Sequence, residues 1–114
     1  LSPACDPDLL ISSLAIAKKM HISAHAGMVF SSDLFSSYNA LGADSWKAWA
    51  KLGALAQDME TYALYATAAY QGKRALSLLT MTDSCVTGEG FGDEMRTTGL
   101  FPMIEVALTL ALEV

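Results

Sequence analysis

Three short stretches of the chain carry side chains that could bind or transform a small polar molecule. The first is the loop 31–37, in which Phe35 stands among serines. The second is Asp58-Met59-Glu60, and the third is Thr82-Asp83, followed by a glycine-rich loop over 84–92. Carboxylates accept hydrogen bonds from hydroxyl donors and can transfer protons to a reacting group. These stretches are therefore the candidate functional segments.

The same residues also have ordinary structural explanations. Asp58 and Glu60 stand where a helix is expected to open, and the helix dipole favours acids in a first turn. Asp83 is suited to capping the turn that follows a strand. Phe35 can anchor its loop in the core, and Arg96 can be a solvated helix residue. Residue type alone leaves both explanations open.

Histidine and cysteine spacing does not suggest a metal site. Cys5 and Cys85 have neither metal-ligand nor redox spacing, and we expect both to be reduced thiols. His21 and His25 have no acidic or cysteine partner at ligand spacing, so we expect both to be structural.

Helix and strand signals alternate along the chain. Apolar spacing and helix-end residues predict helices over 7–21, 45–52, 58–70 and 103–113. Strands are predicted over 27–30 and 75–82, with a short strand or linker over 53–57. This order is typical of an α/β protein whose helices cover a largely buried sheet. Because ligands of such sheets gather at the carboxyl ends of strands, the candidate segments stand in suitable places.

Composition narrows the classes further. The 114 residues are 53% hydrophobic and 17% charged, with a net charge of −5. The scattered basic residues disfavour nucleic-acid binding. The apolar run 101–112 is shorter than the roughly 20 residues of a membrane span. A cytoplasmic location is expected, since a small acidic protein is the ordinary case there. Few charges and a narrow sheet with an open edge predict that apolar surface faces another chain or domain.

The order and spacing of the candidate segments resemble a known family. Phe-Ser-Ser-Asp-Leu-Phe at 30–35, Asp-Met-Glu at 58–60 and Thr-Asp at 82–83 follow one another, and Arg96 comes 13 residues after Asp83. Over essentially the whole chain this series resembles the C-terminal half of the hexameric, bacterial-type purine nucleoside phosphorylases. The resemblance implies a partial nucleoside-phosphorylase-like α/β fold, with a mixed central sheet flanked by helices and incomplete without an N-terminal half. Residues 1–114 would be the C-terminal portion of a single domain.

The resemblance also implies a role for each matching residue. Phe35 would pack against the purine, Met59 would lie under the sugar, and Glu60 would bind ribose hydroxyls. Asp83 would face N7 of the base as the general acid, and Arg96 would assist it. The implied substrate-binding set is Phe35, Gln57, Asp58, Met59, Glu60 and Thr82.

The activity implied is phosphorolysis of purine ribo- and deoxyribonucleosides to the free base and a sugar 1-phosphate. Phosphate would be the co-substrate, and no metal or organic cofactor is implied. The implied partners are the N-terminal half of the same enzyme and further copies in an oligomer, a hexamer by resemblance. Asp83, where other branches carry Asn, resembles the branch that accepts both 6-amino and 6-oxo purines.

Some positions depart from the family pattern. Asp58 replaces the first Glu of Glu-Met-Glu, Thr82 replaces Ser, and Ser36 replaces an aromatic residue after Phe35. The family's phosphate-binding residues lie in a half that these 114 residues do not contain. Two alternatives therefore stay open: a purine nucleosidase of the same superfamily, and a non-catalytic half that acts as an assembly subunit.

Overall fold

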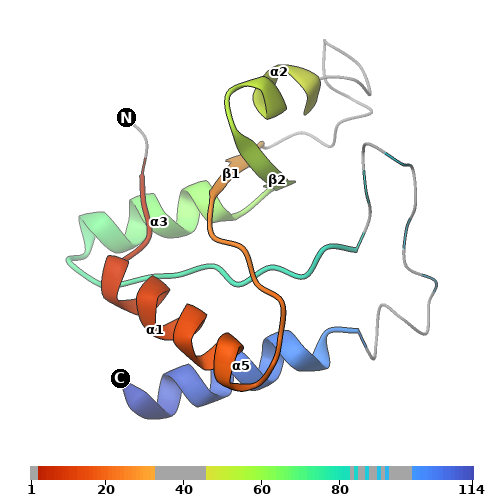
Figure 1. Cartoon of the computed structure of the whole chain (residues 1–114). Helices are drawn as coiled ribbons and strands as arrows, with labels where there is room; N and C mark the ends of the chain where they lie inside the picture. The colour runs from red at the N-terminus through yellow and green to blue at the C-terminus, as the bar shows by residue number, and fades with distance from the viewer. Residues whose placement is uncertain are drawn as a thin grey trace. The chain divides into compact units, whose positions relative to one another are not determined.

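The computed structural model describes residues 3–32, 46–82, 84, 87, 90, 92 and 99–114. Its helices and strands alternate, and the predicted α/β class is confirmed (Figure 1). The chain divides into two compact units, Leu1–Cys5 with Ala26–Ala75 and Asp6–His25 with Leu76–Val114. The elements are α1 (Pro7–Lys19), β1 (Met28–Ser31), α2 (Trp46–Lys51), β2 (Ala54–Asp58), α3 (Thr61–Tyr70) and α5 (Phe101–Glu113).

The first unit is built on a two-stranded parallel sheet of β1 and β2. Phe30 pairs with Gln57 and Ser31 pairs with Asp58, so both strands end at the same edge. Parallel strands need a crossover connection, and α2 lies within the one that joins β1 to β2. The ring of Phe30 stacks on Trp49 of α2, with centroids 4.4 Å apart, which fixes the helix to the strand.

A glycine allows the two strands to approach each other where β1 begins. A β-carbon on Gly27 would lie 2.3 Å from Cδ1 and 2.8 Å from Cγ of Leu55 on β2. Both distances are shorter than real carbon contacts, so any other residue at this position would displace the leucine side chain.

Helix α3 begins three residues later than the sequence predicted, at Thr61 and not at Asp58. The prediction was wrong there because Asp58 is still extended and continues the pairing of β2 with Ser31. The helix ends at Tyr70, and Gly72 follows its C-cap with a positive φ of 66°, as expected for a glycine that terminates a helix. The amide of Lys73 then donates to the carbonyl of Ala68 at 2.8 Å, which closes the helix end.

The second unit pairs α1 with α5. Asp6 caps α1 as predicted: its carboxylate accepts the amide of Leu9 at 3.0 Å. The helix ends with His21 in the left-handed conformation, φ 58°, and the Ile22 amide donates to the Ala17 carbonyl at 2.9 Å. His21 thus has a structural role as a helix terminator.

The core of this unit lies between its two helices. Pro102 is in the first turn of α5, which begins at Phe101, two residues earlier than predicted. The buried side chains of the core are Ile16 and Ala17 from α1 and Val106 and Leu110 from α5.

The strand predicted over 75–82 was wrong. Leu76 and Leu78 pack against the α1–α5 core, and Thr80 Oγ1 lies 3.3 Å from Met103 Sδ. Yet no strand pairing involving residues 75–82 occurs within the described part of the chain. The described regular elements of this unit are helices, and Leu76 and Leu78 pack against the core that these helices form. The described sheet therefore has two strands where three were expected.

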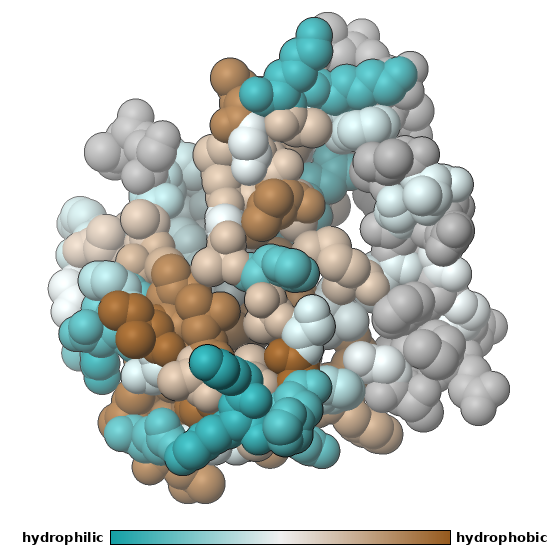
Figure 2. All heavy atoms as spheres, in the orientation of Figure 1, coloured by the Kyte–Doolittle hydropathy of each residue, from teal (hydrophilic) through white to brown (hydrophobic). Residues whose placement is uncertain are grey.

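Large apolar side chains remain at the surface, as the low charge content predicted. Figure 2 shows apolar and polar side chains side by side on one face of the molecule. On α5, one helical stripe is exposed and consists of Phe101, Ile104, Leu108 and Leu112. The described structure thus leaves apolar area uncovered that a folded protein ordinarily buries.

Candidate active site

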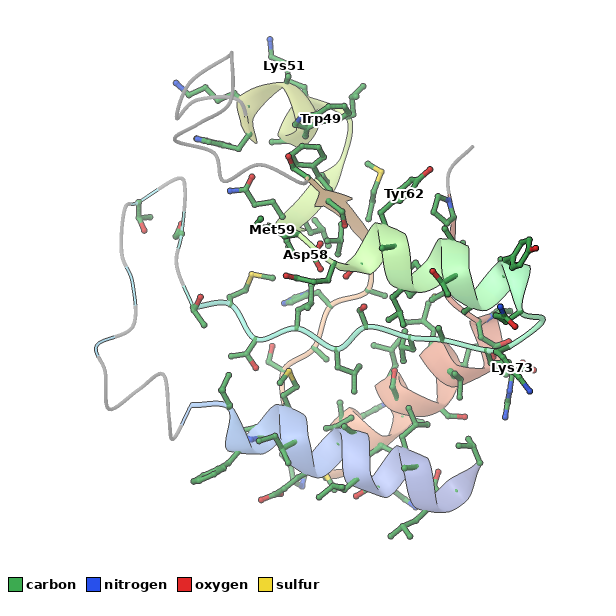
Figure 3. All side chains as sticks on the ribbon, turned by 180° about the vertical axis from the view of Figure 1, so that it is seen from behind. Trp49, Lys51, Asp58, Met59, Tyr62 and Lys73 are labelled. Carbon is green, nitrogen blue, oxygen red and sulfur yellow. The ribbon has the colours of Figure 1, made fainter. Side chains whose placement is uncertain are left out.

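The segment 57–60 forms the turn from β2 into α3, at the carboxyl edge of the sheet. Gln57 and Asp58 are the last residues of β2, and Met59 and Glu60 connect them to Thr61. Asp58 and Met59 lie at the start of α3 in Figure 3. Met59 is 44% exposed, and Glu60 is also exposed. The segment therefore holds four of the predicted substrate-binding residues, of which Gln57, Met59 and Glu60 are exposed and Asp58 is half-buried.

The carboxylate of Asp58 faces the protein. Its Oδ1 accepts the Ser31 hydroxyl at 2.6 Å and the Thr61 amide at 3.4 Å. Its Oδ2 accepts the Thr61 hydroxyl. The Asp58 carbonyl accepts the amide of Ser32 at 3.1 Å. Asp58 therefore connects the ends of both strands to the first residue of α3.

The first turn of α3 is capped by residues other than its own N-cap. Glu60 occupies the N-cap position but makes no side-chain capping hydrogen bond. The amide of Tyr62 donates instead to Ser31 Oγ at 3.0 Å. The Glu60 carboxylate turns toward the preceding residue, where Oε2 accepts the Met59 amide at 3.3 Å. The positive end of the helix dipole favours an acid at this position.

The remaining predicted residues do not all fall within the structure. Thr82 lies in the second unit, whose placement relative to the turn is not defined. Phe35, Asp83 and Arg96 lie outside the described residues. Their roles stay predictions, as do those of Gln57, Asp58, Met59 and Glu60.

Sequence reasoning missed the part that Ser31 plays in this arrangement. It treated Ser31 as a loop residue, whereas the structure places it at the end of β1 opposite Asp58. The available signal was that both residues follow an apolar strand, so a parallel register could bring them together.

Two further properties of the described residues bear on function. In the part of the chain that the structure describes, no group of three or more His, Cys, Asp and Glu side chains is placed to hold a metal ion. No helix within that same part is long and apolar enough to cross a membrane.

Comparison with known proteins identifies the class. The family model of the phosphorylase superfamily matches residues 1–99, and the chain belongs to that superfamily. The α/β elements and the turn at the carboxyl edge of the sheet are consistent with this membership.

Particular relatives are similar over nearly the whole chain. A DeoD-type purine nucleoside phosphorylase of Geobacillus sp. (strain WCH70) is 40% identical over 113 residues, which are 99% of this chain and 46% of the relative. The DeoD-type enzyme of Clostridium perfringens (strain SM101 / Type A) is 40% identical over 111 residues, again 46% of its length. That of Caldanaerobacter subterraneus subsp. tengcongensis is 37% identical over 110 residues. The chain thus spans about half the length of the relatives that it matches.

Proposed function

We propose that this chain supplies the nucleoside-binding residues of a purine nucleoside phosphorylase. The reaction is the reversible phosphorolysis of purine ribo- and deoxyribonucleosides to the free base and a sugar 1-phosphate. The similarity to DeoD-type purine nucleoside phosphorylases along nearly the whole chain supports this function.

The geometry of the turn carries the proposal. Glu60 is an exposed acid at the carboxyl edge of a parallel sheet, and its side chain is not used to cap α3. Such an edge is where α/β proteins bind ligands. A carboxylate accepts hydrogen bonds and can receive two ribose hydroxyl donors at once. Met59, exposed beside it, offers an apolar surface for the sugar.

The chemical step is assigned to residues outside the described part of the chain. Asp83 is the proposed proton donor to N7, because a departing purine accumulates negative charge that protonation relieves. Arg96 is proposed to assist Asp83, and Phe35 to pack against the base. Gln57 and Thr82 complete the residues proposed to contact the substrate, and Asp58, which the resemblance also implies, lies in the same segment as Gln57.

By the family resemblance, the phosphate-binding residues belong to a part of the enzyme outside these 114 residues. We define the complete enzyme as these 114 residues together with that phosphate-binding half, in one chain or in two. The exposed apolar stripe of α5 is consistent with further protein covering the chain. The proposal includes a cytoplasmic location, a role in purine salvage, assembly into an oligomer, and no metal or organic cofactor.

Base release from inosine, with and without phosphate, tests the proposed reaction. The complete enzyme is expected to release hypoxanthine only when phosphate is present, with one sugar 1-phosphate formed for each base. Release of free ribose without phosphate would identify a nucleosidase instead. No turnover with inosine, adenosine or their deoxy forms would indicate a non-catalytic assembly subunit.

A further inference from the structure

The ends of the two strands and the start of α3 are joined by one set of hydrogen bonds, here called the strand-end network. It consists of Ser31, Asp58, Thr61 and Tyr62. Ser31 and Asp58 are register partners in the sheet, and Thr61 and Tyr62 open the helix. Two residues of the network, Asp58 and Thr61, therefore flank the two residues of the turn, Met59 and Glu60.

The donors and acceptors of the network match without conflict. A serine hydroxyl has one proton and two lone pairs, and an ionised carboxylate only accepts. Ser31 gives its proton to Asp58 at 2.6 Å and accepts the Tyr62 amide at 3.0 Å. Asp58 receives Ser31 on Oδ1, together with the Thr61 amide, and the Thr61 hydroxyl on Oδ2. Both oxygens of the Asp58 carboxylate are thus engaged by groups of the protein.

The burial of these residues fits a supporting role. Thr61 is 5% exposed, and Ser31 and Asp58 are half-buried, whereas Met59 and Glu60 face solvent. The residues at the two strand ends are therefore partly covered by protein, whereas Met59 and Glu60 of the turn are exposed to solvent. Ser31 and Asp58 accept the first amides of α3, which the N-cap side chain ordinarily accepts. The Glu60 side chain therefore makes no capping hydrogen bond.

We propose that Ser31 and Asp58 are positioning residues, which fix the turn so that Glu60 can receive the ribose hydroxyls. Asp58 then acts through Glu60 and does not itself bind the sugar. This inference rests on the proposed function, which it deepens by dividing the substrate-binding turn into a supporting acid and a binding acid.

A double-mutant cycle tests the division in the complete enzyme. We would measure dissociation constants of inosine and of hypoxanthine for the wild type, Ser31→Ala, Asp58→Ala and the double variant. Because Ser31 donates to an ionised carboxylate, Ser31→Ala is expected to weaken inosine binding about 10-fold or more and to leave hypoxanthine binding unchanged. The double variant should bind inosine about as weakly as Asp58→Ala, since both changes break the same network. Ser31→Thr, which keeps the hydroxyl, should bind inosine about as tightly as the wild type.

Ser13→Ala is the matched control, because it also removes a serine hydroxyl that donates a hydrogen bond, but at a position outside the strand-end network. The Ser13 hydroxyl is buried in α1 and donates to the Leu10 carbonyl at 2.8 Å. This variant is expected to cost stability without changing the ratio of inosine to hypoxanthine affinity. If Ser31→Ala fails to fold, Ser31→Cys replaces the oxygen by a weakly bonding sulfur and is measured in the same way.

Three results would overturn the inference: unchanged inosine affinity in Ser31→Ala, equal weakening for inosine and hypoxanthine, or additive effects in the double variant. Failure of the proposed function would be recognised separately from the wild type alone. A nucleosidase would release free ribose without phosphate, and a non-catalytic subunit would neither bind nor convert inosine. In that case, amide hydrogen exchange still tests the network: Ser31→Ala should speed exchange at Tyr62, and an unchanged rate would overturn it.

Discussion

Ser31, the last residue of β1, donates its hydroxyl proton to Asp58, the last residue of β2, across 2.6 Å. The two residues stand 27 positions apart in the sequence and are paired by the parallel register. Their bond closes the edge of the sheet from which α3 departs. The turn with Met59 and Glu60 is therefore held from both strands.

Replacement of Glu60 by alanine should separate nucleoside binding from base binding. The charged hydrogen bonds to the ribose would be lost, at a cost of about 1.5–3 kcal/mol, or roughly 10- to 150-fold in affinity. Free purine should bind nearly as before, because it has no ribose. Titration calorimetry of the complete enzyme with inosine and with hypoxanthine measures both values.

Stability should change little in this variant, since Glu60 is exposed and makes no capping bond. Glu105→Ala, which removes an exposed acid of α5, is the control for loss of charge. An equal loss of affinity for base and nucleoside would show that Glu60 acts through folding.

Replacement of Asp83 by asparagine should slow turnover while stability stays the same. General acid catalysis contributes about 10²–10⁴-fold, and asparagine cannot supply the proton. The loss should be smaller for an N7-methylated purine nucleoside, whose base leaves readily without a proton. Steady-state rates on both substrates, for wild type and variant, give the comparison. A loss of the same size on both substrates would exclude Asp83 as the proton donor.

The α1–α5 core predicts different costs for the same substitution at two positions of one helix. Leu110 is 7% exposed and belongs to the core, whereas Leu112 is 89% exposed. Leu110→Ala should lower the free energy of unfolding by about 2–5 kcal/mol through lost burial and the cavity left behind. Leu112→Ala should stay within about 0.5 kcal/mol of the wild type. Urea unfolding of the complete enzyme measures both. Similar costs at the two positions would mean that α5 packs differently.

The close approach of Gly27 to Leu55 predicts that Gly27→Ala lowers stability and that a second substitution, at Leu55, restores it. Gly27→Ala forces the Leu55 side chain to move, and overpacking of this kind costs about 1–3 kcal/mol. A value near the lower end is expected, because Leu55 is 59% exposed and can turn outward. Adding Leu55→Ala should recover most of the loss. Thermal unfolding measures the three proteins, with Gly92→Ala as a control, since no atom lies within 4 Å of a β-carbon there. Additive losses in the double variant would contradict this account.

Local signals predicted two of the helix boundaries correctly. Asp6-Pro7 fixed the start of α1, and Gly72 the end of α3, because capping depends on residues close in sequence. The apolar run 75–82 could not be assigned in the same way. An apolar run of this length predicts that its side chains are buried. Whether the run forms a strand depends on whether another strand lies beside it in the fold. Here Leu76 and Leu78 pack against helices.

The sequence suggested which residues form the candidate site, and their roles stay predictions, but it did not indicate how the described ones are arranged. Residue order indicated Asp58, Met59 and Glu60 as one segment, and the family of the chain agrees with the resemblance that suggested them. The separation of Asp58, a half-buried acid, from Glu60, an exposed acid, depends on the register of β1 against β2. That register is a long-range property, so the sequence did not reveal Ser31 as the partner of Asp58.

A crystal structure of the complete enzyme with a bound purine nucleoside tests the central claim most directly. The account predicts that the Glu60 carboxylate lies within about 2.5–3.0 Å of the ribose hydroxyl oxygens. It predicts equally that Asp58 keeps its hydrogen bond to Ser31 while the sugar is bound. A nucleoside bound away from the turn 58–60, or a ribose held by Asp58 with its bond to Ser31 broken, would contradict the account.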